Sequence, residues 1–138
     1  MASQTSANAW VRQAAARHPL LRGLLVTDAG YFPRAAGHEV DRAQGSATHL
    51  LVACLDGRGW VRGAGRTQPV EAGDLVWFSA GQPHAYGADA SEPSTIVWAH
   101  FRGDEAEAWQ EQLGWAARVP FGMVRVDAGH LADLRLDA

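Results

Sequence analysis

The chain has 138 residues, of which 47% are apolar, so it is long enough for one globular domain and too short for two ordinary ones. Its formal net charge of −3 at pH 7 makes it a poor nucleic-acid binder by itself, because no excess of basic residues neutralises phosphates. The single cysteine, Cys54, excludes an internal disulfide and is typical of a reducing cytoplasm. We expect no secretory signal, because residues 1–9 are polar and lack an apolar core segment, and no apolar run reaches membrane-spanning length.

The first predicted element is a helix over residues 8–17, which ends before His18 and Pro19 because a residue that precedes proline avoids helical backbone. From Leu20 onward, short apolar runs alternate with Gly, Pro and Asp. The runs are LLVT, HEV, HLLVACL, GWVRG, LVWF and TIVWAHF. Runs of this length, rich in β-branched and aromatic residues, predict the strands of an antiparallel sandwich or barrel.

Glycine-containing segments separate these runs and predict the turns. We expect hairpins at residues 56–59 (DGRG) and 63–65 (GAG), because glycine adopts the positive φ that a tight reversal requires. Residues 71–74 (EAGD) are expected to form a tight turn before LVWF.

After Phe101 the apolar period changes from two residues to about 3.6, which indicates a helix. Residues 104–113 place Ala106, Trp109 and Leu113 on one face of that helix. The last residues, LADLRLDA, begin an i, i+3 stripe and predict the start of a further helix.

The stretch from Arg58 to Gly87 carries the most specific pattern. Its elements, with those that follow, are Gly57-x-Gly59-Trp60, Gly65-Arg66, Ala72-Gly73-Asp74-Leu75, Gly81-x-Pro83-His84-x-Tyr86 and Ile96-Val97-Trp98-Ala99-His100-Phe101-Arg102-Gly103. In order and spacing they resemble the arabinose-binding domain of AraC-type transcription regulators, over about residues 23–115. The resemblance implies a mainly β fold, an antiparallel cupin-like β-barrel (jelly roll) with flanking helices.

The same resemblance implies a division of the chain and a set of partners. Residues 1–22 are expected to form an N-terminal arm or helix, 23–103 an effector-binding barrel, and 104–138 a helical segment that begins a dimerisation or linker region. The implied partners are a small-molecule effector, by resemblance a monosaccharide, and a second copy in a cytoplasmic homodimer. DNA would be contacted only through a C-terminal helix-turn-helix domain that is not in these 138 residues.

The alternative function is a stand-alone cupin enzyme that acts on a small sugar or acid. Cupin enzymes hold a divalent metal through two motifs, and the second is recognisable here as Gly73 to His84. In the first motif, the ligand positions fall on Ser46, Thr48 and Val52, none of which binds a transition metal well. We therefore expect no metal, no other cofactor and no catalytic residue. Cys54, within an apolar run, is expected to be an inert core thiol.

Candidate ligand-binding residues follow from the resemblance and from the chemistry of sugar recognition, which combines aromatic faces with polar groups that form several hydrogen bonds. Arg42 matches the arginine that binds sugar hydroxyls, Trp98 the tryptophan on which the sugar stacks, and Tyr86 a tyrosine of the same pocket. Val40 matches an apolar wall residue and shares a strand face with Arg42.

Three further candidates complete the predicted site. Ile96 stands where the arabinose-binding pattern has a histidine, so a ligand with fewer or differently placed hydroxyls is implied. His84 is expected to be a hydrogen-bonded residue at the barrel mouth, and His100 shares the face of Trp98. Structural interpretations stay open for several of these residues: Trp98 and His100 can belong to the core, and Arg42 can be a solvated surface charge.

Overall fold

The computed structural model describes residues 17–18, 22–112 and 121–126. Strands dominate this part of the chain, which also contains one short helix after the eighth strand. In chain order the elements are β1 (Leu25–Phe32), β2 (Glu39–Arg42), β3 (His49–Asp56), β4 (Arg58–Gly63), β5 (Arg66–Glu71), β6 (Asp74–Phe78), β7 (His84–Ala88), β8 (Thr95–Arg102), α2 (Ala106–Gln112) and β9 (Phe121–Arg125). Residues 8–16 of the predicted first helix and the last stripe, from Leu131, lie outside the described residues.

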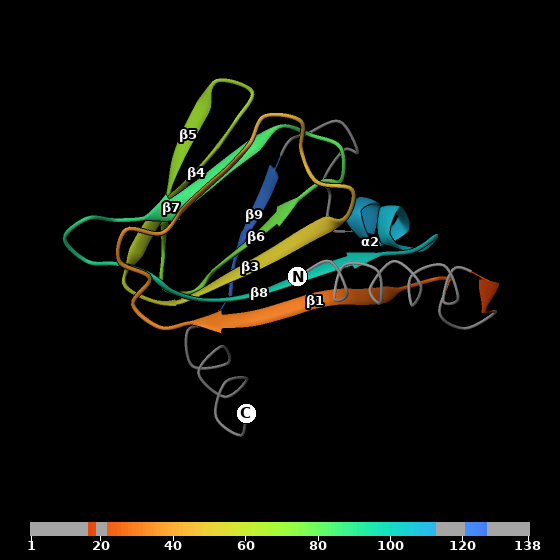
Figure 1. The fold of residues 1–138 in the computed structure, drawn as a ribbon, viewed down its shortest axis with the longest axis horizontal. Coiled ribbons are helices and arrows are strands. Elements are labelled where there is room, and N and C mark those ends of the chain that lie inside the picture. The colour runs from red at the N-terminus through yellow and green to blue at the C-terminus, as the bar shows by residue number, and fades with distance from the viewer. Residues whose placement is uncertain (1–16, 19–21, 113–120, 127–138) are drawn as a thin grey trace, which may run out of the picture.

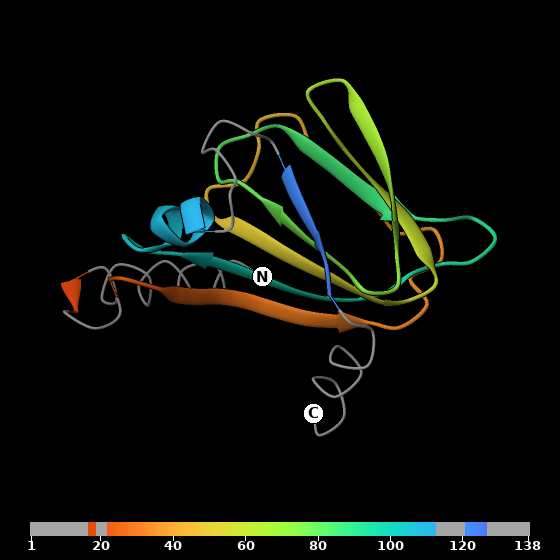
Figure 2. The same ribbon diagram turned by 180° about the vertical axis from the view of Figure 1, so that it is seen from behind.

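The strands form two antiparallel sheets that face each other, one in the order β1-β8-β3-β6-β9 and one in the order β2-β7-β4-β5 (Figures 1 and 2). This arrangement confirms the predicted mainly β, cupin-like jelly roll. The barrel is not closed, however, because no strand ladder joins the two sheets within the described ranges. The sheets converge at one end and diverge toward the end that carries the β4–β5 turn (Figure 1).

The turn at Gly57 shows why the strands separate into two layers. The predicted hairpin over residues 56–59 is wrong, since β3 belongs to the larger sheet and β4 to the smaller one. Gly57 has a φ of 69°, and a Cβ there would lie 2.3 Å from the carbonyl oxygen of Pro93. Only glycine fits this crossing, so an apparent hairpin signal in fact moves the chain from one sheet to the other.

The other two predicted turns are confirmed. Ala64 and Gly65 form the two-residue turn between β4 and β5, with φ values of 53° and 74°. The turn between β5 and β6 contains Gly73 with a φ of 99°, and Asp74 closes it by accepting a hydrogen bond from the Glu71 N–H at 2.9 Å. This second turn also carries the chain between the two sheets.

The main core lies between the sheets and is built by strand alternation. Its buried members are Leu50, Val52, Cys54, Val61, Val70, Val76, Phe78, Tyr86, Ile96 and Phe121, with Val40, Trp98 and Met123 partly buried against them. Cys54 is fully buried, and burial, the largest cause, raises the pKa of its thiol to about 11. The thiol is therefore protonated and unreactive at neutral pH.

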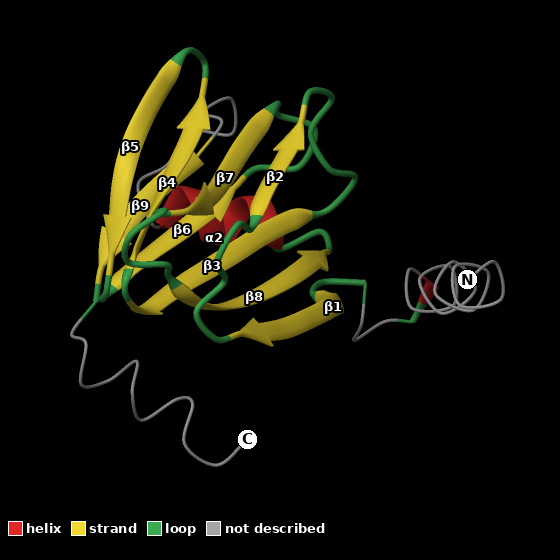
Figure 3. Cartoon of the chain, turned by 60° about the vertical axis from the view of Figure 1, so that its left-hand side comes forward, coloured by secondary structure: helices red, strands yellow, loops and turns green. Residues whose placement is uncertain are grey.

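The helix α2 covers the outer face of the larger sheet (Figure 3). Ala106 packs there with Trp77 and Phe101 in a second apolar cluster. The predicted helix is present, but its buried residues are Ala106 and Gln110, while Trp109 is 53% exposed. Gln110 is drawn inward because its Nε2 donates a 2.8 Å hydrogen bond to Ser79 Oγ.

The sequence predicted a helical segment over residues 104–138, but the described residues after α2 include a strand. Phe121–Arg125 forms β9, which pairs antiparallel with β6 at the edge of the larger sheet. Phe121 pairs with Phe78 and Met123 with Val76, so alternate residues of β9 complete the core. A strand here satisfies the otherwise unpaired edge of β6, a long-range requirement that helical periodicity cannot reveal.

Candidate functional site

The predicted ligand-binding residues lie on the inner faces of both sheets. In the smaller sheet, Val40 pairs with Tyr86 and Arg42 with His84. In the larger sheet, Ile96, Trp98 and His100 are opposite Cys54, Val52 and Leu50, three residues of the main core. Directly opposed residues point to the same face of a sheet, so all seven candidates point toward the space between the layers.

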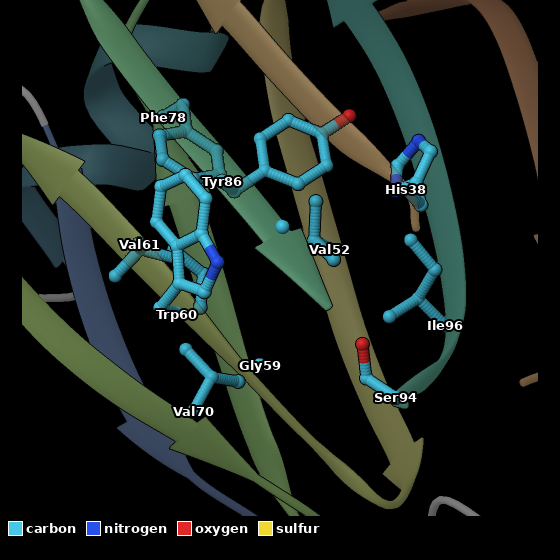
Figure 4. A pocket seen from close by; sticks show the side chains of 12 residues that line it. His38, Val52, Gly59, Trp60, Val61, Val70, Phe78, Tyr86, Ser94 and Ile96 are labelled. Atoms are coloured by element: carbon cyan, nitrogen blue, oxygen red, sulfur yellow. The ribbon is translucent and has the colours of Figure 1, made fainter. Parts of the chain in front are cut away.

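A narrow cavity occupies the middle of this space (Figure 4). Its walls are His38, Val52, Gly59, Trp60, Val61, Val70, Val76, Phe78, Tyr86, Gly87, Ser94 and Ile96. About 20 Å³ of it is open to a water-sized sphere, which is room for water and not for a sugar. A ligand of monosaccharide size therefore enters only if wall side chains move, or binds nearer the mouth.

Three aromatic rings extend from the cavity toward the open end. Phe78 stacks on Tyr86 with ring centroids 5.3 Å apart and on His84 at 4.5 Å. Their faces form one wall of the interior, and Trp98 is half-buried against the same core. The sequence reasoning missed Phe78, together with the cavity residues His38 and Ser94. The alternation of LVWF would have placed Phe78 inward, whereas His38 and Ser94 carry no local signal because loops bring them to the site.

Polar side chains gather where β2 ends and β7 begins, and we call Arg42, His84, His100 and Thr48 the mouth cluster. The Arg42 Nη1 donates a hydrogen bond to His84 Nε2 at 3.1 Å, and His84 Nδ1 donates to the Gln82 carbonyl at 3.0 Å. The Arg42 guanidinium also lies 5.9 Å from the centre of the Tyr86 ring. These contacts hold His84 as a neutral imidazole with a defined tautomer.

The opposite side of the mouth cluster comes from the larger sheet. His100 Nδ1 and Thr48 Oγ1 are 3.0 Å apart, and Thr48 Oγ1 is 3.1 Å from Ser46 Oγ. Burial, followed by the charge of Arg42, lowers the pKa of His100. Burial likewise lowers the pKa of His84, to which Arg42 also contributes. Both imidazoles are therefore neutral at pH 7, and Arg42 carries the positive charge of the cluster.

Trp98 occupies a position that depends on a glycine in the neighbouring strand. Gly30 of β1 pairs with Trp98, and a Cβ at Gly30 would lie 2.2 Å from the indole Cζ2. The indole therefore lies directly over the Gly30 backbone, with one side against the core and the other half-exposed. This is an arrangement in which an aromatic face can stack on a ligand.

A wider groove opens at the rim of the smaller sheet, beside the mouth cluster. It is about 270 Å³ in volume and is lined by Asp41, Arg42, Ala43, Arg62, Gly63, Ala64, Gly65, Pro83, His84 and Ala85. Arg42 and His84 thus face both this groove and the interior. The groove approaches the size of small-ligand sites, about 300 Å³ and above.

The three positions that would supply metal ligands in the first cupin motif are Ser46, Thr48 and Val52, and each has another role here. Ser46 and Thr48 are hydrogen-bonded to each other, and Val52 belongs to the core. Within the described ranges, no three His, Cys, Asp or Glu side chains are placed to hold a metal ion. The arrangement at the mouth can bind and orient a polar group, and its aromatic walls can cover an apolar or carbohydrate face.

Two facing antiparallel sheets, with polar groups converging at the open end, define a cupin-like small-molecule-binding domain. Comparison with known families then places it more narrowly. The model of the AraC-like ligand binding domain matches residues 28–136. The chain belongs to this family, and it is the ligand-binding domain of an AraC-type regulator.

Individual relatives agree with this placement. The chain is 40% identical over 102 residues to the MmsAB operon regulatory protein of Pseudomonas aeruginosa PAO1, a match that covers 71% of this chain and 33% of that protein. The chain thus spans about a third of the length of this relative. No helix within the described residues is long and apolar enough to cross a membrane.

Solved structures share the fold at low sequence identity. ToxT K231A from Vibrio cholerae superposes with a TM-score of 0.54 at 8% identity, over 81% of this chain and 45% of that one. YhaK from Escherichia coli gives a TM-score of 0.52 at 12% identity, over 76% and 44% of the two chains. At such identities the likeness concerns the fold alone.

Proposed function

We propose that this domain binds a small, hydroxylated effector of monosaccharide size and transmits its presence to a DNA-binding segment outside these 138 residues. The observation that supports the proposal most directly is the convergence of Arg42, His84 and His100 at the open end of an aromatic-walled interior. Such a mixture of a cation, imidazoles and ring faces is typical of sites for polar small molecules. We infer that the domain binds without catalysis and acts in the cytoplasm.

The proposed mechanism is linkage between ligand binding and domain arrangement. An effector that contacts both sheets at their diverging end binds best to one spacing of the two layers and shifts the population toward it. Because the outer face of the larger sheet carries α2, a change in that sheet reaches the helical region. The shift can be no larger than the difference in affinity for the two arrangements.

A thermal-shift screen over pentoses, hexoses and small hydroxy acids tests the binding proposal. A ligand at a hundredfold excess over its Kd should stabilise the domain by about 2.7 kcal/mol. Trp98→Ala should abolish that stabilisation while costing less than a fully buried aromatic truncation, which is about 3–5 kcal/mol. If Trp98→Ala instead unfolds the domain, the indole belongs to the core and not to a binding surface.

We also propose that the domain forms a homodimer through the side that carries α2. An apolar hollow there is lined by Leu51, Leu75, Trp77, Trp109 and Gln112, and the exposed Trp109 stands at its edge. Burial of such a surface against a second copy would be favourable. Sedimentation at high micromolar concentration should show a dimer, and a strictly monomeric profile would contradict the proposal.

A further inference from the structure

The half-buried Arg42 lacks an acidic partner, unlike three other arginines of the sheets, Arg58, Arg62 and Arg125. Arg58 pairs with Glu92 at 3.2 Å, Arg62 with Asp41 at 3.6 Å, and Arg125 with Asp74 at 3.1 Å. Arg42 forms no ion pair within the described part of the chain. Its one hydrogen bond there, to His84 Nε2, uses Nη1 and leaves the Nε and Nη2 donors for another group.

The groups around Arg42 are neutral or can donate hydrogen bonds. His84 accepts from Arg42 and donates its Nδ1–H to the Gln82 carbonyl, so it offers no negative charge. His100 is hydrogen-bonded through Nδ1 to Thr48, and its Nε2 forms no hydrogen bond to any described residue. The Tyr86 ring lies beside the guanidinium. A planar cation with a free edge, next to an imidazole, matches the geometry of a carboxylate.

The acids nearest the cluster do not neutralise it. Asp41 follows Val40 on β2, but it points to the outer face and pairs there with Arg62. Asp28 on β1 is opposite His100. Its negative charge raises the pKa of His100, although burial and Arg42 lower that pKa more. Asp28 is itself exposed to solvent. Neither acid pairs with the Arg42 guanidinium, so the fixed positive charge at the mouth has no partner on the described chain.

We propose that the mouth cluster binds the carboxylate of the effector, with Arg42 as its main partner and His100 as a second donor. The rest of the effector then lies against Trp98, Tyr86 and Ile96. The ligand class becomes a small hydroxylated acid, such as a sugar acid or hydroxy acid, in place of a neutral sugar. This inference rests on the proposed function, because it names the kind of molecule that the same site takes.

The first experiment uses acetate, which carries the proposed group alone, and acetamide as its neutral counterpart. The imidazole and guanidinium resonances of the 138-residue chain are followed by NMR at constant ionic strength. Acetate should shift the signals of Arg42, His84 and His100 in a saturable way and raise the pKa of His100, because a nearby anion favours the imidazolium. Acetamide should do neither.

Variants show whether the effect belongs to this site. Arg42→Gln should abolish the response to acetate, whereas Arg42→Lys should weaken it, since a lysine keeps the charge and loses the planar fork. Arg58→Gln is the matched control: it removes an arginine of the same sheet that pairs with Glu92, and it should leave the response unchanged. No saturable response to acetate, an equal response to acetamide, or a response that survives Arg42→Gln would each overturn the inference.

A second experiment separates this inference from the proposed function. Matched pairs, D-galacturonate with D-galactose and lactate with propane-1,2-diol, are compared by calorimetry. In a pair that binds, the acid should have a Kd about 10- to 100-fold lower than its neutral counterpart. This difference corresponds to one charge-assisted hydrogen bond. A neutral compound that binds as well as its acid would overturn the carboxylate assignment and keep the proposed function. If acetate binds at Arg42 but Trp98→Ala changes the affinity of no larger ligand, the carboxylate assignment stands and the proposed effector pocket is contradicted.

Discussion

Replacement of Gly30 by alanine tests whether the Trp98 indole covers the neighbouring strand. An added Cβ would lie 2.2 Å from Cζ2 and 2.3 Å from Cη2 of the indole, whereas carbon atoms in contact are about 3.5–4.0 Å apart. Either the indole or the strand must move. Overpacking of this kind costs about 1–3 kcal/mol, so Gly30→Ala should lower the free energy of unfolding by that amount.

The same substitution should have the opposite effect when the indole is absent. In a Trp98→Ala background the new methyl group has room, and alanine is better than glycine within a strand by about 0.5–1 kcal/mol. The two single changes should therefore be coupled by about 2 kcal/mol or more in a double-mutant cycle. Gly30→Ala should also weaken effector binding, because it displaces the proposed stacking surface.

Urea denaturation of the four proteins, followed by far-UV circular dichroism, measures this coupling without relying on tryptophan fluorescence. The denaturation midpoint should fall for Gly30→Ala and rise for Gly30→Ala in the Trp98→Ala background, with similar slopes in each. If Gly30→Ala is equally destabilising in both backgrounds, the indole does not cover Gly30 and the geometry argued for Trp98 is wrong.

Three further predictions concern the turn, the histidines and metal. Ala64→Asn should stabilise the domain by about 0.5–1 kcal/mol in thermal unfolding, because asparagine tolerates the left-handed backbone that alanine adopts there; a loss of stability would contradict this turn geometry. Burial lowers the pKa of His49, His84 and His100, so the unfolded chain takes up protons first and the free energy of unfolding should fall as pH drops below about 6.5. His49, whose Nδ1 accepts from the Ala80 N–H, follows Thr48 but packs against Trp77 and Phe101 on the outer face of the larger sheet, and His49→Gln should make that pH dependence shallower. Elemental analysis after tag-free purification should find no stoichiometric zinc, iron, nickel or manganese, and finding one would revive the cupin-enzyme alternative.

The sequence predicted the features that depend on local pattern. Alternation along HLLVACL and TIVWAHF was sufficient to predict strands with Val52 and Trp98 on defined faces, since strand periodicity is a property of neighbouring residues. The two-residue turn at Ala64 and Gly65 was recognisable for the same reason. Motif spacing pointed to the family, and the family match confirms it. The binding roles of the candidate residues, Arg42 and Trp98 included, stay predictions.

Other features were decided by contacts between residues far apart in the chain. Gly57 looks like a hairpin glycine, but its approach to Pro93 makes it a crossing between sheets. Trp109 fits an apolar helix stripe, yet the hydrogen bond from Gln110 to Ser79 turns a different face inward.

The site itself shows this division between sequence and tertiary structure. Sequence alone places Arg42 and His84 as polar residues on two strands separated by 42 positions. Only the antiparallel pairing of β2 with β7 brings the guanidinium onto the imidazole, and only the facing sheet adds His100. The sequence determines the chemistry of each side chain. The convergence of these side chains results from long-range strand pairing, which no local pattern encodes.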